Sequence, residues 1–305
     1  MFDIVTLGAA TLDVFLKSTK FSLGDGTLDI QNAGEKSDVE EASVATGGAA
    51  TNTAVGFARM GFSVACICEI GTDFAGDVVL QDLKQEGVDT SLTISERSEQ
   101  TAVAALLISK DGGRTALVYR GASRMITSED VEWNTLQTKW MHLSTVGNIE
   151  LISRAMAFCK QRGVKLSWNP GNWEIARIAS GELKPDWSTV EVLCVNREEM
   201  AKLTGLALDS DDIWNGNWSF IGPRIVVVTD GKRGGKYLAD GRLKTYTVEP
   251  TTTVQETGAG DAFITGFLCG QLSGRIVEDC IELGKKSAAA VVQHMGAKVG
   301  LPRKR

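Results

Sequence analysis

Histidine, proline and cysteine are scarce in this chain. Its 305 residues include only two histidines, five prolines and six cysteines. No two cysteines form a C-x-x-C pair, and neither His142 nor His294 has a neighbour at metal-ligand spacing. These absences argue against structural zinc and against a disulfide framework. They favour free, buried thiols in a reducing compartment, so we expect a cytoplasmic protein.

Long apolar runs and strong net charge are also missing. No stretch of eighteen apolar residues occurs, and the N-terminal MFDIVTLGAATLDVF has no basic region before its apolar part. We therefore expect neither a membrane span nor a signal peptide. The formal net charge is −6, so no overall basic field attracts nucleic acid or membrane. We interpret the locally basic VGLPRKR at the C-terminus as a solvated tail.

Two common phosphate-binding motifs are absent. The chain has no G-x-x-x-x-G-K-[ST], and no G-x-G-x-x-G follows its first predicted strand. A P-loop enzyme and a standard dinucleotide-binding protein are therefore not supported.

Apolar strands and amphipathic helices alternate through most of the sequence. Buried strands are predicted at residues 2–8, 63–71, 140–145, 164–170, 190–196 and 224–231, and helices at 51–60, 75–86, 150–163, 197–205, 261–273 and 276–294. This alternation indicates an α/β fold with a mostly parallel sheet.

Two segments interrupt that alternation. Residues 18–41 are polar and rich in turn signals, and residues 101–109 and 115–121 flank a DGGR turn. We expect these segments to form a small antiparallel flap on the main domain. A further hairpin is expected at residues 234–249.

The stretch VQETGAGDAFITG, residues 254–266, joins a polar segment to a predicted helix. A helix N-terminus offers unpaired N–H groups and partial positive charge to an anion. Gly258 and Gly260 lack Cβ atoms, so a ligand can approach their backbone closely. Asp261 could cap the helix, or it could take a proton from a hydroxyl that attacks a phosphoryl group.

A second glycine cluster, TGGAATN, opens the helix predicted at residues 51–60. Gly47 and Gly48 could form only a turn and a cap, or their backbone could approach a polar ligand to which Asn52 also binds. Asp13, just past the first strand, is either a turn residue or a hydroxyl-binding group facing the same crevice.

These pieces, in this order, resemble the ribokinase-like family of carbohydrate and nucleoside kinases, the PfkB family. The resemblance covers nearly the whole chain. It includes GAATLD, GGAATNTAVGFARMG, IGTDFAGDVVLQDLKQEGVDTS, SWNPG, VNREEMAKLTG, VVTDGKRGG and ETGAGDAFITGF. It implies a three-layer α/β/α sandwich, a single catalytic domain over residues 1–305, and a β lid formed by about residues 15–45 and 101–121.

The resemblance also implies roles for individual residues. Asp261 would be the general base, and Gly258, Ala259 and Gly260 would form the anion hole. Asp13, Gly47, Gly48 and Asn52 would bind the acceptor hydroxyls. Thr229, Gly231, Gly234 and Asn196 would line the ATP site, where Glu199 would organise Mg²⁺ through water. The partner would be a sugar or a nucleoside, and lids of this family often contribute to a homodimer.

The chain departs from the family pattern at several positions. Gln255 stands where many members have an aspartate, and Glu256 where a threonine is usual. Ser144 and Thr145 replace an acidic residue found in ribokinase, and Lys285 aligns with an asparagine near adenine. These departures put the monovalent-cation site, the sugar identity and the adenine contacts in doubt.

Two classes of function remain open at this point. The first is an ATP-dependent kinase, and the second is a non-catalytic binding or regulatory protein on the same fold. Within the first class, ribose, fructose, a phosphorylated hexose and a nucleoside are all compatible acceptors. Arg120 and Arg124 could hold an acceptor phosphate, although solvated surface arginines are the simpler interpretation.

Overall fold

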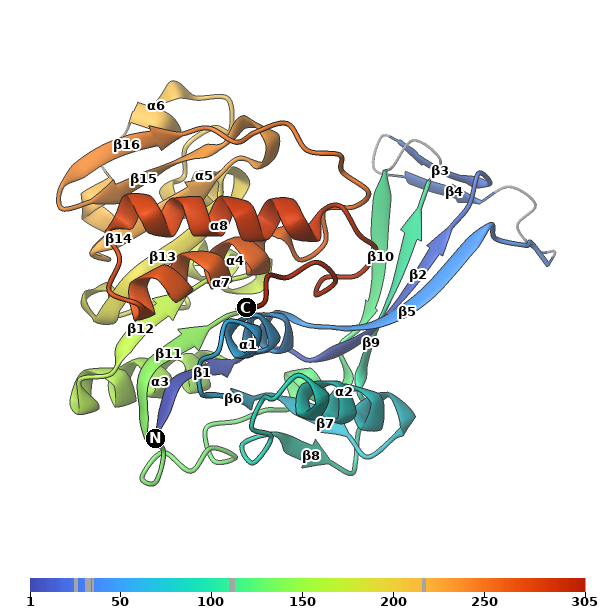
Figure 1. Ribbon diagram of the computed structural model, residues 1–305, viewed down its shortest axis with the longest axis horizontal. Coiled ribbons are helices and arrows are strands. Elements are labelled where there is room, and N and C mark those ends of the chain that lie inside the picture. The colour runs from blue at the N-terminus through green and yellow to red at the C-terminus, as the bar shows by residue number, and fades with distance from the viewer. Residues whose placement is uncertain (25–26, 31–33, 35, 110–112, 216–217, 305) are drawn as a thin grey trace.

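A mostly parallel sheet of eight strands forms the centre of the molecule (Figure 1). The computed structural model describes residues 1–24, 27–30, 34, 36–109, 113–215 and 218–304. In spatial order the strands are β16 (Arg242–Tyr246), β15 (Gly235–Ala239), β14 (Ile225–Thr229), β13 (Val190–Asn196), β12 (Lys165–Trp168), β11 (Thr138–Leu143), β1 (Phe2–Leu7) and β6 (Val64–Ile67). Only the β14–β15–β16 edge is antiparallel.

Helices cover both faces of this sheet. One face carries α1 (Ala49–Arg59), α2 (Phe74–Gln85), α7 (Ala259–Leu272) and α8 (Val277–Val291), and the other carries α3 (Ile149–Arg162), α4 (Asn172–Ser180) and α5 (Arg197–Thr204). Successive residues of β1 alternate between two apolar cores, because Ile4 joins the first set of helices and Val5 the second. The predicted three-layer α/β/α sandwich is confirmed.

A second sheet projects from the sandwich (Figure 1). Its strand order is β10 (Arg114–Tyr119), β9 (Ala102–Ile108), β2 (Thr11–Lys17) and β5 (Glu41–Gly47), and the hairpin β3 (Phe21–Gly24)–β4 (Thr27–Ile30) extends its tip. We call these four strands the flap sheet. The expectation of a purely antiparallel flap was wrong, because β2 pairs with β9 in parallel. The pairing is non-local, so no turn signal in the sequence reveals it.

Several boundaries differ from the prediction. The strand expected at residues 63–71 is two strands, β6 and β7 (Glu69–Gly71), and β7 pairs instead with β8 (Ile94–Glu96). The helix expected to reach residue 294 ends at Val291. The helix α4 and the short helix α6 (Asp211–Asn215) were not predicted. Residues 111 and 112 of the DGGR turn lie outside the described residues.

The order in which strands are added to the sheet changes direction at β1. Strand β6 lies on one side of β1, and strands β11 to β14 lie in sequence order on the other. Ligands of open α/β sheets bind beyond the carboxyl ends of the strands at such a switch point. None of the described helices is long and apolar enough to cross a membrane.

Candidate active site

Asp261 and Asn52 meet where two helices begin. Asp261 lies in the first turn of α7, and Asn52 lies in the first turn of α1. The Asn52 side-chain amide nitrogen donates a hydrogen bond of 2.8 Å to one Asp261 carboxylate oxygen. Close packing of the two helices makes this possible, since a Cβ on Gly56 would lie only 2.6 Å from the Thr265 methyl group.

The surroundings of Asp261 keep its carboxyl group less acidic than usual. Burial is the largest cause and the nearby negative charge of Asp13 adds to it, whereas the Asn52 hydrogen bond opposes them; together they raise the pKa of Asp261 to about 6. A carboxyl group with that pKa is ionised at neutral pH and is still able to accept a proton. It therefore has the protonation behaviour of a general base.

Asp13 lies in β2 opposite β5, on the flap sheet. Its side chain is buried, and the Thr11 hydroxyl donates to it at 2.7 Å. Burial raises the pKa of Asp13, while the Thr11 hydrogen bond and the positive charge of Lys298 oppose the shift. The charge of Asp13 reaches Asp261, so the two predicted site carboxylates lie near each other.

The glycine pair at residues 47 and 48 is required by this packing. A Cβ on Gly47 would overlap the carboxylate of Asp13. Gly48 is the N-cap of α1 with φ +94°, and a Cβ there would overlap the carbonyl oxygen of Ala9. Both glycines therefore have a structural explanation, and they also bring backbone close to the acceptor site predicted around Asp13 and Asn52.

Asn52 has one side-chain atom that no described residue satisfies. Its Oδ1 is buried and accepts no hydrogen bond within the described part of the chain. A buried acceptor without a donor costs roughly 1–3 kcal/mol. A ligand hydroxyl that donates to Oδ1 would remove that cost, so this atom points to a polar ligand beside Asp261.

The N-terminus of α7 has the form of an anion site. Gly258 is its N-cap with φ +80°, and a Cβ there would lie 2.6 Å from the Cβ of Ala297. Gly260 differs, because a Cβ at this helical position would meet no described atom within 4 Å beyond its chain neighbours and the adjacent backbone of its own helix. Glycine inside a helix costs about 0.5–1 kcal/mol relative to alanine. The space beside Gly260 is compatible with the close approach of a ligand to its backbone that the sequence predicts.

The residues predicted to bind nucleotide lie at the ends of β13 and β14. Asn196 and Thr229 are paired across the two strands. Gly234 has φ +86° and would overlap Tyr246 if it carried a Cβ, whereas Gly231 has open space around it. The thiol of Cys194 in β13 experiences the negative charges of both Glu199 and Asp261. Glu199 at the predicted nucleotide end of the site and Asp261 at the predicted acceptor end therefore both lie within electrostatic range of Cys194.

The N-x-x-E pattern forms a capping box at the start of α5. The Asn196 side chain accepts from the Glu199 N–H, and Glu199 Oε2 accepts from the Asn196 N–H, both at 2.8 Å. Burial raises the pKa of Glu199, and the hydrogen bonds from Asn196 oppose the shift. This pair has a clear structural role beside its predicted role with Mg²⁺.

The described residues contain no cluster of three His, Cys, Asp or Glu side chains that could hold a metal ion. Mg²⁺ commonly keeps several waters and binds through one or two carboxylates and the substrate phosphates. Single carboxylates such as Glu199 fit that manner of binding and do not fit an all-protein metal cage.

Two charged residues near the predicted site were given no role in the sequence analysis. Asp230 follows β14, accepts two hydrogen bonds from Arg233 at 2.7 and 2.6 Å, and contacts Arg197 at 3.5 Å. On the flap sheet, Arg114 lies within electrostatic range of Glu256 in the loop before α7. Asp230 lies within the VVTDGKRGG motif and Arg114 ends the DGGR turn, but neither side chain was singled out.

The positions that depart from the family pattern have defined local roles. The Gln255 side chain is buried and hydrogen-bonds the backbone of Thr257. Ser144 donates to the Leu7 carbonyl at 3.2 Å, and Lys285 pairs with Glu282 at 2.8 Å. Arg124 is exposed and lies near Glu99.

Comparison with known proteins gives a consistent result over the whole chain. A profile described as pfkB family carbohydrate kinase matches residues 1–304. Ribokinase of Staphylococcus aureus (strain COL) is 28% identical over 307 residues, which cover 98% of this chain and 96% of that protein. Probable fructokinase-5 of Arabidopsis thaliana is 30% identical over 310 residues, which cover 96% and 90%. The structure of Arabidopsis thaliana ribokinase complexed with ribose and ATP has a TM-score of 0.80 at 20% identity, and the alignment covers 98% and 95% of the two chains.

Proposed function

Because the chain belongs to the pfkB family of carbohydrate kinases, we propose that it transfers the γ-phosphate of ATP to a hydroxyl of a sugar or nucleoside. The hydrogen-bonded pair of Asn52 and Asp261 carries this proposal. It combines a proton acceptor whose pKa is raised to about 6 with an adjacent helix N-terminus suited to a phosphoryl group.

In the proposed reaction Asp261 accepts the proton of the acceptor hydroxyl. The hydroxyl oxygen forms a bond to the γ-phosphorus, the bond from that phosphorus to the bridging oxygen breaks, and ADP leaves with the electron pair. N–H groups of Gly258, Ala259 and Gly260 stabilise the charge on the moving phosphoryl group. Phosphoryl transfer depends mainly on such positioning and charge stabilisation.

The acceptor is held, in this proposal, by Asp13, Asn52 and the backbone of Gly47 and Gly48. The buried carboxylate of Asp13 accepts from one hydroxyl, and the unpartnered Oδ1 of Asn52 accepts from another. Two acceptors of this kind suit a polyol such as a sugar ring or a ribosyl group.

The nucleotide lies, in this proposal, along Thr229, Gly231, Gly234 and Asn196. Mg²⁺ bound to the ATP phosphates would neutralise their charge, and Glu199 would orient its water ligands. Gln255 supplies no carboxylate near the anion hole, so we propose that a monovalent cation contributes little.

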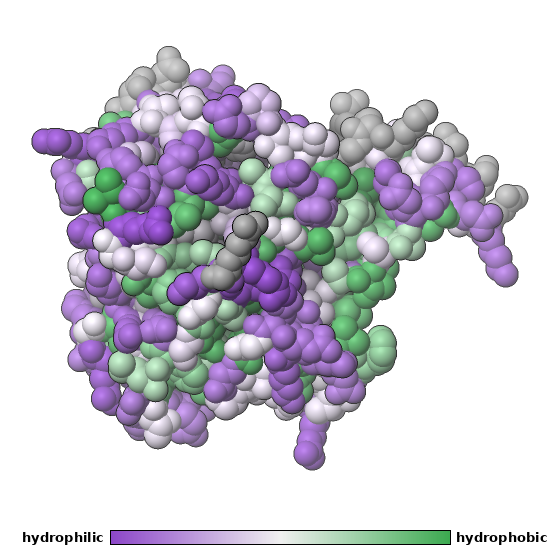
Figure 2. All heavy atoms as spheres, in the orientation of Figure 1, coloured by the Kyte–Doolittle hydropathy of each residue, from purple (hydrophilic) through white to green (hydrophobic). Residues whose placement is uncertain are grey.

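We further propose that the flap sheet is a lid that closes over the acceptor and excludes water. Its outer face exposes Leu117 and Tyr119, with Leu117 58% exposed. Figure 2 shows apolar side chains along the projecting flap. A homodimer formed through this face would cover them. Leu117→Lys should then convert a dimer to a monomer in sedimentation, and an unchanged sedimentation coefficient would contradict the contact.

An ADP-release assay over a panel of sugars, sugar phosphates and nucleosides tests the proposed function. We expect ADP release that depends on one acceptor class and that is lost in Asp261→Asn. If no member of the panel raises ADP release above the rate without acceptor, while nucleotide binding is retained, a non-catalytic binding protein would instead be favoured.

A further inference from the structure

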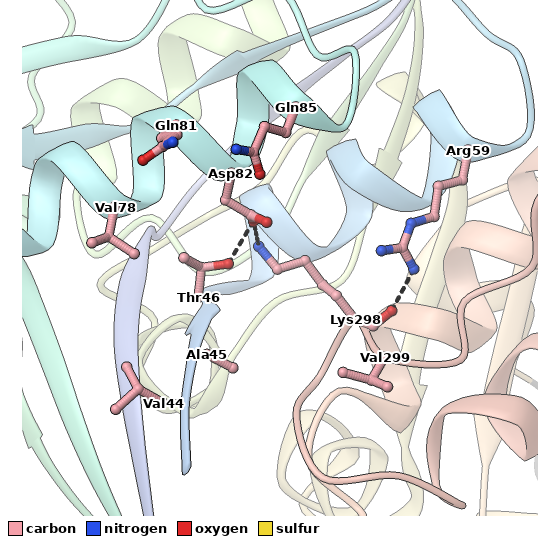
Figure 3. A pocket seen from close by; sticks show the side chains of 10 residues that line it. All are labelled: Val44, Ala45, Thr46, Arg59, Val78, Gln81, Asp82, Gln85, Lys298 and Val299. Carbon is pink, nitrogen blue, oxygen red and sulfur yellow. Dashed lines mark hydrogen bonds and ion pairs between the residues drawn. The ribbon is translucent and has the colours of Figure 1, made fainter.

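A cavity of about 360 Å³ lies behind the flap strand β5, outside the candidate active site. Ten residues line it: Val44, Ala45, Thr46, Arg59, Val78, Gln81, Asp82, Gln85, Lys298 and Val299 (Figure 3). They come from the flap, from α1, from α2 and from the chain after α8. The volume lies within the range of small-molecule sites, which is roughly 300–1,000 Å³.

The wall of this cavity combines positive charge, amides and apolar surface. Arg59 and Lys298 bring positive charge to the wall, and each is paired with a carboxylate, Arg59 with Glu86 at 2.7 Å and Lys298 with Asp82 at 2.6 Å. Arg303 also contacts Glu86, at 2.8 Å, so three cations against two carboxylates leave a formal excess of +1 over these five side chains. Gln81 and Gln85 are exposed and add amide donors. Three valines provide apolar contact at positions 44, 78 and 299. This lining suits a small organic anion with an apolar body.

A hydrogen-bond network connects the cavity to the flap. Asp82 Oδ2 accepts from Lys298 Nζ at 2.6 Å and from the Thr46 hydroxyl at 2.5 Å. Arg59 Nη1 donates to the Lys298 carbonyl oxygen at 2.6 Å. Figure 3 shows Thr46 and Lys298 converging on the same carboxylate. An anion that competes with Asp82 for Lys298 therefore also disturbs the partner of Thr46, the residue before Gly47.

The C-terminal segment of residues 292–299 connects the cavity to the anion-hole loop. The Val292 carbonyl accepts from the backbone N–H groups of Val254 and Gln255 at 2.8 and 3.2 Å. Ala297 packs against Gly258.

The same segment also contacts the flap. Met295 packs on the flap cluster of Phe15, Ala104, Leu106 and Ile108. Lys298 and Val299 then line the cavity. One short segment thus contacts the cavity, the flap and the start of α7.

We propose that this cavity is a regulatory site for a small organic anion, whose binding shifts the position of the flap. A ligand changes an equilibrium only by its different affinity for the two states. One wall of the cavity is the flap strand β5, and the others belong to α1, α2 and the C-terminal segment. Movement of the flap would therefore change the shape of the cavity and with it the affinity for the anion. The effect on turnover rests on the proposed kinase activity, whereas binding to the cavity does not.

Binding is tested with acetate, hexanoate and benzoate by calorimetry, at concentrations up to about 20 mM, which populate a site of millimolar affinity. Benzamide has the body of benzoate without its charge. We expect benzoate or hexanoate to bind and benzamide to bind about tenfold or more weakly than benzoate. Absence of binding by all three anions, or equal binding of benzoate and benzamide, would overturn the proposal.

A matched pair of variants locates the site. Gln81→Glu adds a negative charge to the cavity wall at an exposed position of α2, so it should weaken anion binding by about tenfold. Gln137→Glu makes the same change at an exposed position just before β11, away from this cavity, and should leave binding unchanged. Equal effects of the two variants would contradict the location.

Coupling is tested by hydrogen exchange with and without benzoate. We expect changed exchange in β5, in β9 and in residues 292–299, and a change of turnover of about twofold or more at saturating benzoate. Binding without any change in these three segments would overturn the regulatory role. Changed exchange in a protein that shows no kinase activity would contradict the proposed function and leave the anion site supported.

Discussion

The side-chain amide of Asn52 is hydrogen-bonded to the carboxylate of Asp261 across 209 residues of sequence, at 2.8 Å. The bond joins the first turn of α1 to the first turn of α7. It connects the predicted acceptor-binding group to the predicted base, so a substitution at either position alters the other. This relationship changes how variants of the two residues should be interpreted.

Asp261→Asn tests the base directly. The variant keeps the shape of the side chain but cannot accept a proton from the acceptor hydroxyl, so kcat should fall by about 10² or more while ATP affinity is largely retained. Asp279→Asn is the matched control, because Asp279 is an exposed acid in the first turn of α8. Turnover near the wild-type value in Asp261→Asn would exclude Asp261 as the base.

The pH dependence of kcat should reflect the raised pKa of Asp261. The ionised carboxylate is the active form, so activity should be lost as the pH falls through about 6. The Asn52 hydrogen bond lowers this pKa, and Asn52→Ala should move the acid limb to higher pH. The negative charge of Asp13 raises it, and Asp13→Asn should move the limb to lower pH. Shifts of equal sign in the two variants would contradict the assignment.

Asp13 offers the cleaner test of acceptor binding, because Asn52 also contacts Asp261. Asp13→Ala should raise the KM of the acceptor by removing a hydrogen-bond partner, typically a loss of about 0.5–3 kcal/mol, with little effect on ATP affinity. Asp209→Ala, at an exposed position after α5, is the control. Loss of ATP affinity with an unchanged acceptor KM would mean that Asp13 belongs to the nucleotide site.

Glu199 combines a structural role with a predicted role toward Mg²⁺, and two variants separate them. Glu199→Gln keeps an oxygen that can accept from the Asn196 N–H, so thermal stability should stay near the wild-type value. Glu199→Ala removes the capping interaction and should cost about 0.5–2 kcal/mol of unfolding free energy.

The dependence of kcat on Mg²⁺ concentration is the second measurement on these variants. If Glu199 orients water on Mg²⁺, the Gln variant should need more Mg²⁺ for half-maximal activity. Unchanged stability together with an unchanged Mg²⁺ dependence in Glu199→Gln would leave capping as its sole role.

Local glycine patterns predicted much of the candidate site. The pairs around Gly47 and Gly258 mark helix starts, and the structure gives both positions a positive φ or a close neighbour that requires glycine. Buried strands and helices of the sandwich were predictable for the same reason, because their apolar periodicity is local.

Non-local contacts could not be read from the sequence. Pairing of β2 with β9 joins segments that are far apart in the sequence, and no local pattern shows that they meet. The hydrogen bond from Asn52 to Asp261 depends on the packing of α1 against α7. Likewise, Asp230 and Arg197 become neighbours only when β13 and β14 pair. Such contacts arise from tertiary packing, which residue propensities and motif spacing do not predict.

The last prediction concerns potassium and starts from the side chain of Gln255. Its Oε1 accepts from the Thr257 N–H at 2.6 Å, and its Nε2 donates to the Thr257 carbonyl oxygen at 3.0 Å. Both amide atoms are therefore engaged with the loop that leads to the anion hole. A hard cation prefers oxygen ligands, and full negative charge binds it better than a carbonyl dipole does.

We therefore expect potassium to activate the enzyme weakly or not at all. Glu256 could supply a carboxylate only by turning inward, and it is exposed in the structure. The measurement compares kcat and KM with and without potassium, at constant ionic strength in a sodium-free buffer. Gln255→Asp removes the donor to the Thr257 carbonyl and adds a carboxylate, so potassium activation should appear or increase in this variant. A many-fold activation of the wild-type enzyme would show that backbone carbonyls suffice for the cation, and it would overturn the role given to Gln255.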